Sequence, residues 1–454
     1  MQLLSFPFAI IALSTVALSV GCVASDDKGT DDTSTQTTDT GAAIVDDDSD
    51  GVAVDDDCDD TDANLGAVSD DGDCDGALTA DDCDDGDVNL GAVSDDGDCD
   101  GALTADDCDD GDAAINPGAI DELLADMDCV EGISDNSLAL AGYSFVGENS
   151  GDGAGFSVSS AGDVDGDDLD DILVGANANN DSAGKVYLIL GASLGSTSAI
   201  DLSNADYSFV GENSGDGAGV SVSSAGDVDG DDLDDLLVGA DGCDDYAGKV
   251  YLILGASLGI TSEIELSDAD YSFAGENNYD SVGQSVSSAG DVDADGLDDL
   301  LMGSYGNDGA GKVYLILGAS LGITSEIDLS NADYSFVGQY NVDYAGFSVS
   351  NAGDVDGDGL DDLLVGAQNN DDGGSSAGKT YLILGASLGV SSEIDLYYAD
   401  HSFVGENNYD RSGVSVSSAG DVDGDGLDDL LVGADDNGDS GSGAGKAYLI
   451  LSGL

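Results

Sequence analysis

The feature that most constrains this chain is an acidic nonapeptide that returns five times in its C-terminal part. The fourth copy reads DVDGDGLDD, and the copies begin at Asp163, Asp227, Asp291, Asp354 and Asp421. They lie 63 to 67 residues apart, and each runs directly into an apolar segment such as LLVGA. A repeat of this length predicts one supersecondary unit per copy, stacked on its neighbours.

Each unit contains four strand-like segments, which in the first unit read GFSVSSAG, DDILVGA, GKVYLILG and DYSFVGE. The second and third are continuous apolar runs, typical of strands covered on both faces. The first alternates small polar and apolar residues, as expected of a strand lining a narrow channel. Four-stranded units repeated radially predict an all-β fold, a β-propeller, over residues 133–454.

The acidic loop has the chemistry of a calcium site. Side chains at loop positions 1, 3, 5 and 9 can converge on one point, with a backbone carbonyl from position 7, and calcium prefers such hard oxygen ligands. Without a cation between them, these carboxylates could not all ionise. The predicted ligands are Asp163, Asp165, Asp167, Asp171, Asp227, Asp229, Asp231, Asp235, Asp291, Asp293, Asp295, Asp299, Asp354, Asp356, Asp358, Asp362, Asp421, Asp423, Asp425 and Asp429.

The units resemble FG-GAP repeats, the blades of the integrin α-chain propeller. The calcium loop between the first two strands matches fully, whereas GFSVS and VGA match the family name only loosely. The resemblance implies a propeller of five four-stranded FG-GAP blades that contains Ca²⁺ and binds ligands on the face away from the calcium.

The two ends of the repeat region carry complementary leftovers. GYSFVGE at 142–148 is a fourth-strand sequence with no blade before it, and GKAYLIL at 445–451 is a third strand with no fourth after it. Unpaired strand edges are costly and prone to aggregate. We therefore expect residues 143–147 to pair with 446–451, so that the N-terminal strand closes a five-bladed ring in a monomer. The alternative is an open arc completed by a second molecule.

The loops opposite the acidic loops differ most between units and carry tyrosines. Exposed aromatic and arginine side chains on loops are common at recognition surfaces. We expect a protein or glycan ligand there, although these tyrosines could instead cover blade edges. The candidate ligand-binding residues are Tyr246, Tyr279, Tyr305, Tyr340, Tyr344, Tyr409 and Arg411.

Residues 1–22 predict an export signal, because an apolar run ends at LSVGC. This ending resembles a bacterial lipoprotein signal, which implies Cys22 as the lipidated residue and a lipid anchor as the only contact with the membrane. The expected location is the cell surface or outer membrane, otherwise the secreted fraction. An ordinary cleaved signal or an uncleaved anchor are the alternatives. Residues 23–43, rich in Ser, Thr and Asp, predict a disordered tether.

Residues 44–132 contain a second acidic repeat, with a period of 25 residues. Its loops have the EF-hand calcium spacing with Asp in place of the final Glu, but no helices flank them. They resemble thrombospondin type 3 repeats and bacterial metal-binding repeats; a solvated acidic spacer is the alternative. The predicted ligands are Asp46, Asp48, Asp50, Asp57, Asp71, Asp73, Asp75, Asp82, Asp96, Asp98, Asp100 and Asp107.

The same region contains six cysteines, which predict disulfide staples in an exported segment with almost no apolar core. Six cysteines allow fifteen pairings; the set 58–74, 83–99 and 108–129 uses every thiol with one pattern per unit. Zinc is the rival interpretation, but the spacing is too wide for a CxxC site. Cys243 is a lone thiol elsewhere. The six are Cys58, Cys74, Cys83, Cys99, Cys108 and Cys129.

Composition narrows the function further. The chain has 97 acidic and 7 basic residues and a formal charge of −90, which excludes nucleic acid and anionic lipid surfaces as partners. No serine elbow, Cys–His pair or phosphate loop is present, and the single histidine, His401, replaces a strand tyrosine. We therefore expect no enzyme. Two functions remain: a calcium-binding adhesion or ligand-binding propeller at the cell surface, or a structural, cation-sequestering envelope component without a dedicated ligand.

Overall fold

A computed structural model describes residues 138, 141–195, 198–259, 261–389 and 391–453. The chain divides into two units, 1–137 and 138–454, and the fold described below is that of the second. The predicted signal, tether, acidic calcium repeats and their cysteines lie outside the described residues. None of the helices within the described ranges is long and apolar enough to cross a membrane.

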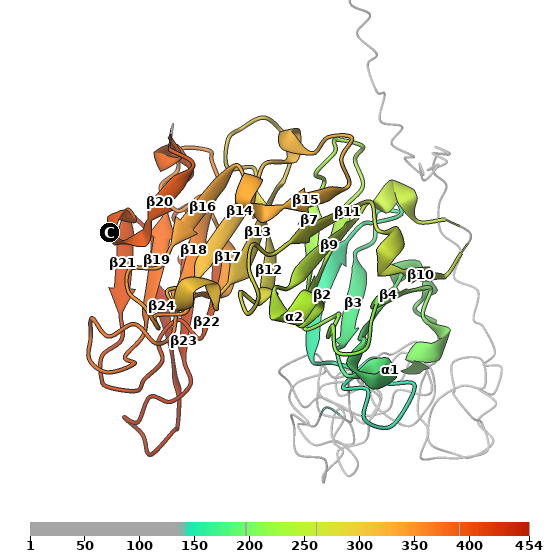
Figure 1. Cartoon of the computed structure of the whole chain (residues 1–454), viewed down its shortest axis with the longest axis horizontal. Helices are drawn as coiled ribbons and strands as arrows, with labels where there is room; N and C mark the ends of the chain where they lie inside the picture. The colour runs from blue at the N-terminus through green and yellow to red at the C-terminus, as the bar shows by residue number, and fades with distance from the viewer. Residues whose placement is uncertain (1–137, 139–140, 196–197, 260, 390, 454) are drawn as a thin grey trace, which may run out of the picture. The chain divides into compact units, whose positions relative to one another are not determined.

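The second unit is a row of five sheets, here called blades 1 to 5 (Figure 1). Blade 1 comprises β2 Ser157–Gly162, β3 Asp171–Ala176, β4 Lys185–Ile189, β6 Tyr207–Val210 and β10 Glu263–Glu265. Blade 2 comprises β7 Ser221–Gly226, β8 Asp235–Ala240, β9 Lys249–Ile253, β11 Tyr271–Ala274 and β15 Glu326–Asp328. Blade 3 comprises β12 Val282–Gly290, β13 Asp299–Ser304, β14 Lys312–Ile316, β16 Tyr334–Val337 and β20 Glu393–Asp395.

The last blades have fewer strands. Blade 4 comprises β17 Ala345–Gly353, β18 Asp362–Ala367, β19 Lys379–Ile383 and β21 His401–Val404. Blade 5 comprises β22 Ser415–Gly420, β23 Asp429–Ala434 and β24 Lys446–Ile450. A separate pair is formed by β1 Ser144–Val146 and β5 Ala199–Asp201.

Short helical turns lie in the connections. The two α-helical turns are α1 Asn179–Ser182 and α2 Cys243–Tyr246. The 3-10 turns are η2 Gly191–Ser193, η3 Leu202–Asn204, η4 Gly255–Ser257, η5 Leu266–Asp268, η6 Asn307–Gly309, η7 Gly318–Ser320, η8 Leu329–Asn331, η9 Gly385–Ser387 and η10 Leu396–Tyr398.

The first four strands of each complete blade form an antiparallel meander, as the sequence predicts. The first strands of successive blades, β2, β7, β12, β17 and β22, lie next to one another on the inner side of the row. Blades 1 to 3 also carry an outer parallel strand that the four-strand pattern does not predict. It is supplied by the following unit: β10, for example, pairs with β6 through Glu263↔Ser208.

The core lies between the blades. Leu173, Leu188 and Phe209 of blade 1 pack against Leu236 and Val238 of blade 2, and all five side chains are fully buried. Equivalent clusters join blades 2 and 3, 3 and 4, and 4 and 5. Each blade therefore buries its apolar faces against its neighbours, as the continuous apolar strands predict.

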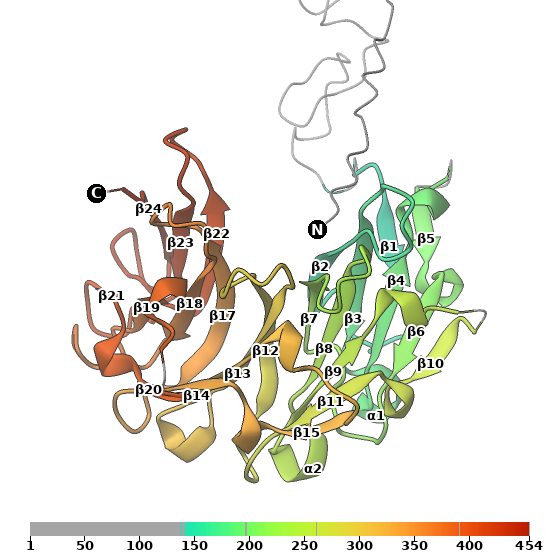
Figure 2. The same cartoon turned by 90° about the horizontal axis from the view of Figure 1, so that it is seen from above.

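The predicted ring closure is wrong. β1 pairs in parallel with β5, through Phe145↔Ile200, and does not pair with β24. Within the described ranges, β24 pairs only with β23. Figure 2 shows blade 5 and the β1–β5 pair at opposite ends of an arc. β5 pairs with β1 as the outer parallel strand β10 pairs with β6. The curvature of the row keeps β1 apart from β24, so that the inner edge of β1 has no partner among the described residues.

Candidate metal centre and far-face surface

Each acidic loop is a tight turn between the first two strands of a blade. In blade 1, Asp163 Oδ1 accepts hydrogen bonds from the backbone N–H of Gly166 (2.8 Å) and Asp167 (3.0 Å), and its Oδ2 accepts one from Asp168 (2.8 Å). Asp168 has a left-handed backbone, with φ of 67°, a conformation that is strained for residues other than glycine. The loop therefore folds around the carboxylate at its first position.

The carboxylate at position 9 anchors the loop to the rest of the blade. Asp171 Oδ2 accepts a hydrogen bond from Val164 N–H (3.0 Å), and its Oδ1 accepts one from Gly191 N–H (2.8 Å) after the third strand. The same two contacts recur in all five loops. Position 9 thus fixes the acidic loop against the connection that starts at η2 in blade 1.

The loops bring three carboxylates together at each of the five turns. In every group one oxygen of each residue lies within 4.8 Å of the others, and positions 1 and 3 always take part. The third member is position 5 in three loops and position 9 in two. The groups are Asp163, Asp165, Asp171; Asp227, Asp229, Asp231; Asp291, Asp293, Asp295; Asp354, Asp356, Asp362; and Asp421, Asp423, Asp425.

Burial and like charge oppose ionisation of these groups. Burial first, and then the charges of Asp167 and Asp163, raise the pKa of Asp165. Burial raises the pKa of both Asp235 and Asp299 to about 7, although the backbone N–H groups that donate hydrogen bonds to these carboxylates act to lower it. A cation placed among the oxygens would reverse this balance, because opposite charge favours the ionised form.

Neighbouring acidic loops are linked by the carboxylate at position 8. Asp234 Oδ2 of blade 2 accepts a hydrogen bond from Asp163 N–H of blade 1 (2.8 Å), and Asp298, Asp361 and Asp428 repeat the contact. We call this contact the loop latch. Gly162 permits it, because its φ is +72° and a Cβ there would overlap the Asp234 carboxylate. Sequence reasoning missed the latch, although the paired DD in every loop was its signal.

The described chain does not neutralise its own acidic loops. All six lysine and arginine side chains in the described ranges form ion pairs elsewhere. Lys312 Nζ, for example, lies 2.6 Å from Glu276 Oε1 and 5.0 Å from the centre of the Tyr314 ring. No lysine or arginine of the described ranges therefore forms an ion pair with an acidic loop.

The predicted ligand-binding tyrosines lie on the loops at the opposite ends of the strands, here called the far face. Tyr246 and Tyr279, from neighbouring units, stack with ring centres 6.1 Å apart and are 55% and 69% exposed. Both have left-handed backbones, with φ of 65° and 71°. Tyr305 is half-buried and makes edge-to-face contacts with Tyr344 and Phe347.

Of the remaining predicted ligand residues, Tyr340 and Tyr409 are exposed. Arg411 is already engaged: its Nε donates to Asp435 Oδ1 (3.0 Å) and a second guanidinium nitrogen donates to Asp435 Oδ2 (2.6 Å), with Asp436 also in range. Arg411 therefore joins two loops of the far face.

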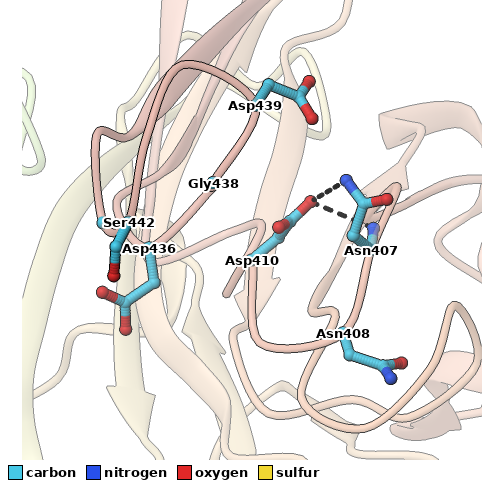
Figure 3. Close-up of a pocket in the computed structure, with 8 residues that line it drawn as sticks. Asn407, Asn408, Asp410, Asp436, Gly438, Asp439 and Ser442 are labelled. Atoms are coloured by element: carbon cyan, nitrogen blue, oxygen red, sulfur yellow. Dashed lines mark hydrogen bonds between the residues drawn. The ribbon is translucent and has the colours of Figure 1, made fainter.

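A polar cavity of about 350 Å³ lies between the loops 407–410 and 436–443 (Figure 3). Asp410 points into the wall between them, where its Oδ2 accepts hydrogen bonds from Asn407 N–H (3.0 Å) and Asn437 Nδ2 (2.8 Å). Buried aspartates take the same place in the other units, as Asp152 does with Asn179. The Asp410 contacts therefore belong to the architecture of the loops.

Cys243 and His401 carry no site within the described ranges. Cys243 is buried at the start of α2, with its sulfur 3.8 Å from the Tyr251 hydroxyl, and burial raises the pKa of its thiol to about 12. A protonated, buried thiol is chemically inert. His401 is exposed on β21 and opposite Leu382 of β19.

Five segments match the family model described as FG-GAP repeat: residues 154–189, 218–253, 282–316, 345–383 and 412–450. Curated relatives include "Integrin alpha pat-2" of Caenorhabditis elegans, 30% identical over 45% of this chain and 17% of the relative. "Integrin alpha-5" of Xenopus laevis is 31% identical over 52% of this chain and 22% of the relative. The chain thus spans about a fifth of the length of these relatives.

Proposed function

We propose that this FG-GAP repeat protein, which is similar to integrin alpha chains, is an exported calcium-binding protein. Its far face binds a protein or glycan ligand at the cell surface. The observation that carries the proposal is the convergence of three carboxylates at each of five equivalent turns. The similarity to integrin alpha chains and the apolar N-terminal run support an extracellular location.

Calcium fits these loops by their donor set. Carboxylate and carbonyl oxygens are the ligands that Ca²⁺ takes, in flexible geometry with six to eight donors. When bound, the ion supplies charge compensation. The chain's own residues do the rest: position 9 fixes the loop to the blade through two backbone N–H groups, and position 8 ties it to the preceding blade. Calcium would therefore stabilise both a blade and its contact with the next.

The far face supports ligand binding through its exposed aromatic side chains. The Tyr246–Tyr279 stack spans two neighbouring units and stands free of the core. Stacked aromatic surfaces suit sugar rings and the aliphatic stems of basic side chains.

A second candidate is a structural, cation-sequestering component without a dedicated ligand. One observation favours it: all six cationic side chains of the described ranges are already ion-paired, so the acidic surface stays open to solution cations. The two candidates share the calcium sites and differ only at the far face.

Calcium titration by calorimetry tests the metal sites. We expect at least five sites per chain, and chelation should lower the melting temperature by many degrees, because a ligand that binds only the folded state stabilises it. Asp293→Asn should remove one site. Asp308→Asn is the matched control, since it makes the same charge change at an exposed turn of the same blade. An unchanged site count in Asp293→Asn, or a melting curve indifferent to chelator, contradicts the calcium assignment.

Glycan and protein arrays, probed with and without calcium, test the far face. We expect specific binding that Tyr279→Ala abolishes. Tyr397→Ala is the control. Tyr397 is similarly exposed (64%) and has an aromatic neighbour, Tyr398, but it lies in η10 and not in a far-face loop. If the protein binds no ligand on the arrays while its calcium binding is intact, the structural candidate is supported instead.

A further inference from the structure

The two ends of the arc each leave open what the interior blades close. In blades 1 to 4 the third strand pairs with a fourth, as β4 does with β6 and β19 with β21. Over the described ranges, the outer edge of β24 has no such partner. At the other end, β1 has the sequence of a fourth strand, but its only partner in those ranges is β5 on its outer side.

The interior pairs define how these two edges would fit. In blade 1, Lys185 lies opposite Val210, Val186 opposite Phe209 and Tyr187 opposite Ser208. The same register would place Lys446 opposite Val146 and Ala447 opposite Phe145. Residues 143–147 repeat the fourth-strand sequence YSFVG found at 207–211, so the edge of β24 is complementary to β1.

The apolar faces of the two end blades are complementary in the same sense. Toward the next blade, Leu188 of blade 1 is fully buried, whereas its counterpart in blade 5, Leu449, is 48% exposed. Toward the preceding blade, Val222 of blade 2 is 7% exposed, whereas its counterpart in blade 1, Val158, is 67% exposed. The last end therefore presents the leading half of an interface that the chain forms internally four times. The first end presents the inner part of the trailing half, around Val158, because Val174 and Tyr187 are already buried in a cluster that includes Phe145 of β1.

The loop latch is also left unmade once at each end. Asp163, Asp227, Asp291 and Asp354 each donate a backbone N–H to the position 8 carboxylate of the following blade. Beside Gly162, this space is filled by the Asp234 carboxylate. Beside the equivalent Gly420 of blade 5, no atom of the described chain fills it. At the start of the arc, Asp170 holds the position 8 place and is exposed.

We propose that blade 5 of one copy of this chain packs on blade 1 of a second copy, head to tail, with β24 pairing with β1 of that copy. Strand register, apolar faces and the latch all point to the same contact. The second copy is the occupant because it carries both halves, while the two ends of a single chain stand apart (Figure 2). This assembly replaces the expected monomer. A head-to-tail contact forms a ring when its rotation closes and a filament when it does not.

Light scattering and sedimentation of the full chain in calcium test the assembly. We expect the mass to rise with concentration in whole multiples of the chain. Val158→Asp blocks the first end and Leu449→Asp blocks the last, and each variant alone should remain a monomer. Both positions are already exposed in the single chain, so neither change should impair folding. Val342→Asp, at a 56% exposed far-face position, is the control and should assemble like the parent.

Mixing the two blocked variants gives the decisive result. Each keeps one intact end, so an equimolar mixture should form a dimer and nothing larger. A parent chain that stays monomeric at every concentration overturns the proposal, because its ends are then closed within the chain or covered by residues 1–137. Assembly of either blocked variant alone also overturns it, because the contact would then be symmetric.

Disulfide trapping tests the register. We expect Phe145→Cys chains mixed with Ala447→Cys chains to form a covalent dimer on oxidation, well above the background of the unchanged cysteines in the parent. Val342→Cys mixed with Ala447→Cys should show only that background. An assembling mixture without the enriched Phe145–Ala447 cross-link overturns the β24–β1 pairing.

Discussion

Blades 3 and 5 are built from almost the same sequence and have different environments. The first reads SSAGDVDADGLDDLLMG and the second SSAGDVDGDGLDDLLVG, and both fold into the same hairpin. Yet Leu301 of blade 3 is fully buried, whereas the equivalent Leu431 of blade 5 is 41% exposed. Local structure is thus set within a unit, and burial is set by the neighbours that the unit has in the row.

Truncating the equivalent leucine in both blades gives the strongest test of this difference in burial. Leu301→Ala should lower the free energy of unfolding by about 2–5 kcal/mol, because it removes a fully buried side chain and leaves a cavity. Leu431→Ala should cost less than about 1 kcal/mol in a single chain. Chemical denaturation of the two variants at low concentration provides the measurement. Equal losses would show that blade 5 is covered in the monomer.

The loop latch offers a second matched pair. Asp298→Ala removes the acceptor of Asp227 N–H and should cost about 1–3 kcal/mol, because a sheltered donor loses its partner. Asp170→Ala deletes the equivalent carboxylate at the exposed first end and should leave the melting temperature nearly unchanged. Thermal unfolding with saturating calcium compares them. A loss at Asp170 as large as at Asp298 would contradict the role assigned to the latch.

The smallest effect concerns pH in the chelated protein. Burial raises the pKa of Asp299 to about 7, whereas an unfolded aspartate titrates near 3.9. The folded state therefore binds the proton more tightly, and the stability that this contributes is lost as pH rises from about 4 through 7. We expect the melting temperature to fall over this window, and Asp299→Asn to flatten part of the slope. A chelated protein whose stability rises over the window would contradict this account.

Much of the blade could be predicted from the sequence because its signals are local. The apolar run DILVGA and the alternation in SVSSAG specify β3 and β2 within one unit. The loop positions of Asp163 and Asp165 likewise predict carboxylates that the structure brings together. The sites in 44–132 and their disulfides lie outside the described residues and stay predictions.

The features that sequence reasoning missed depend on a second unit. The outer strand β10 is three residues long, with only Ile264 half-buried between exposed neighbours, too short a pattern to be read as a strand. Asp298 and Asp299 are adjacent and chemically alike, yet one reaches the preceding blade and the other its own loop. The partner of β1 was mispredicted because strand complementarity says nothing about the curvature of the row.

In blades 1 to 3 the outermost strand comes from the repeat that forms the next blade. β10, for example, completes blade 1, although the chain runs from it directly into β11, the fourth strand of blade 2. Deleting or duplicating a whole repeat between two interior blades would therefore leave the strands at both ends of the row unchanged.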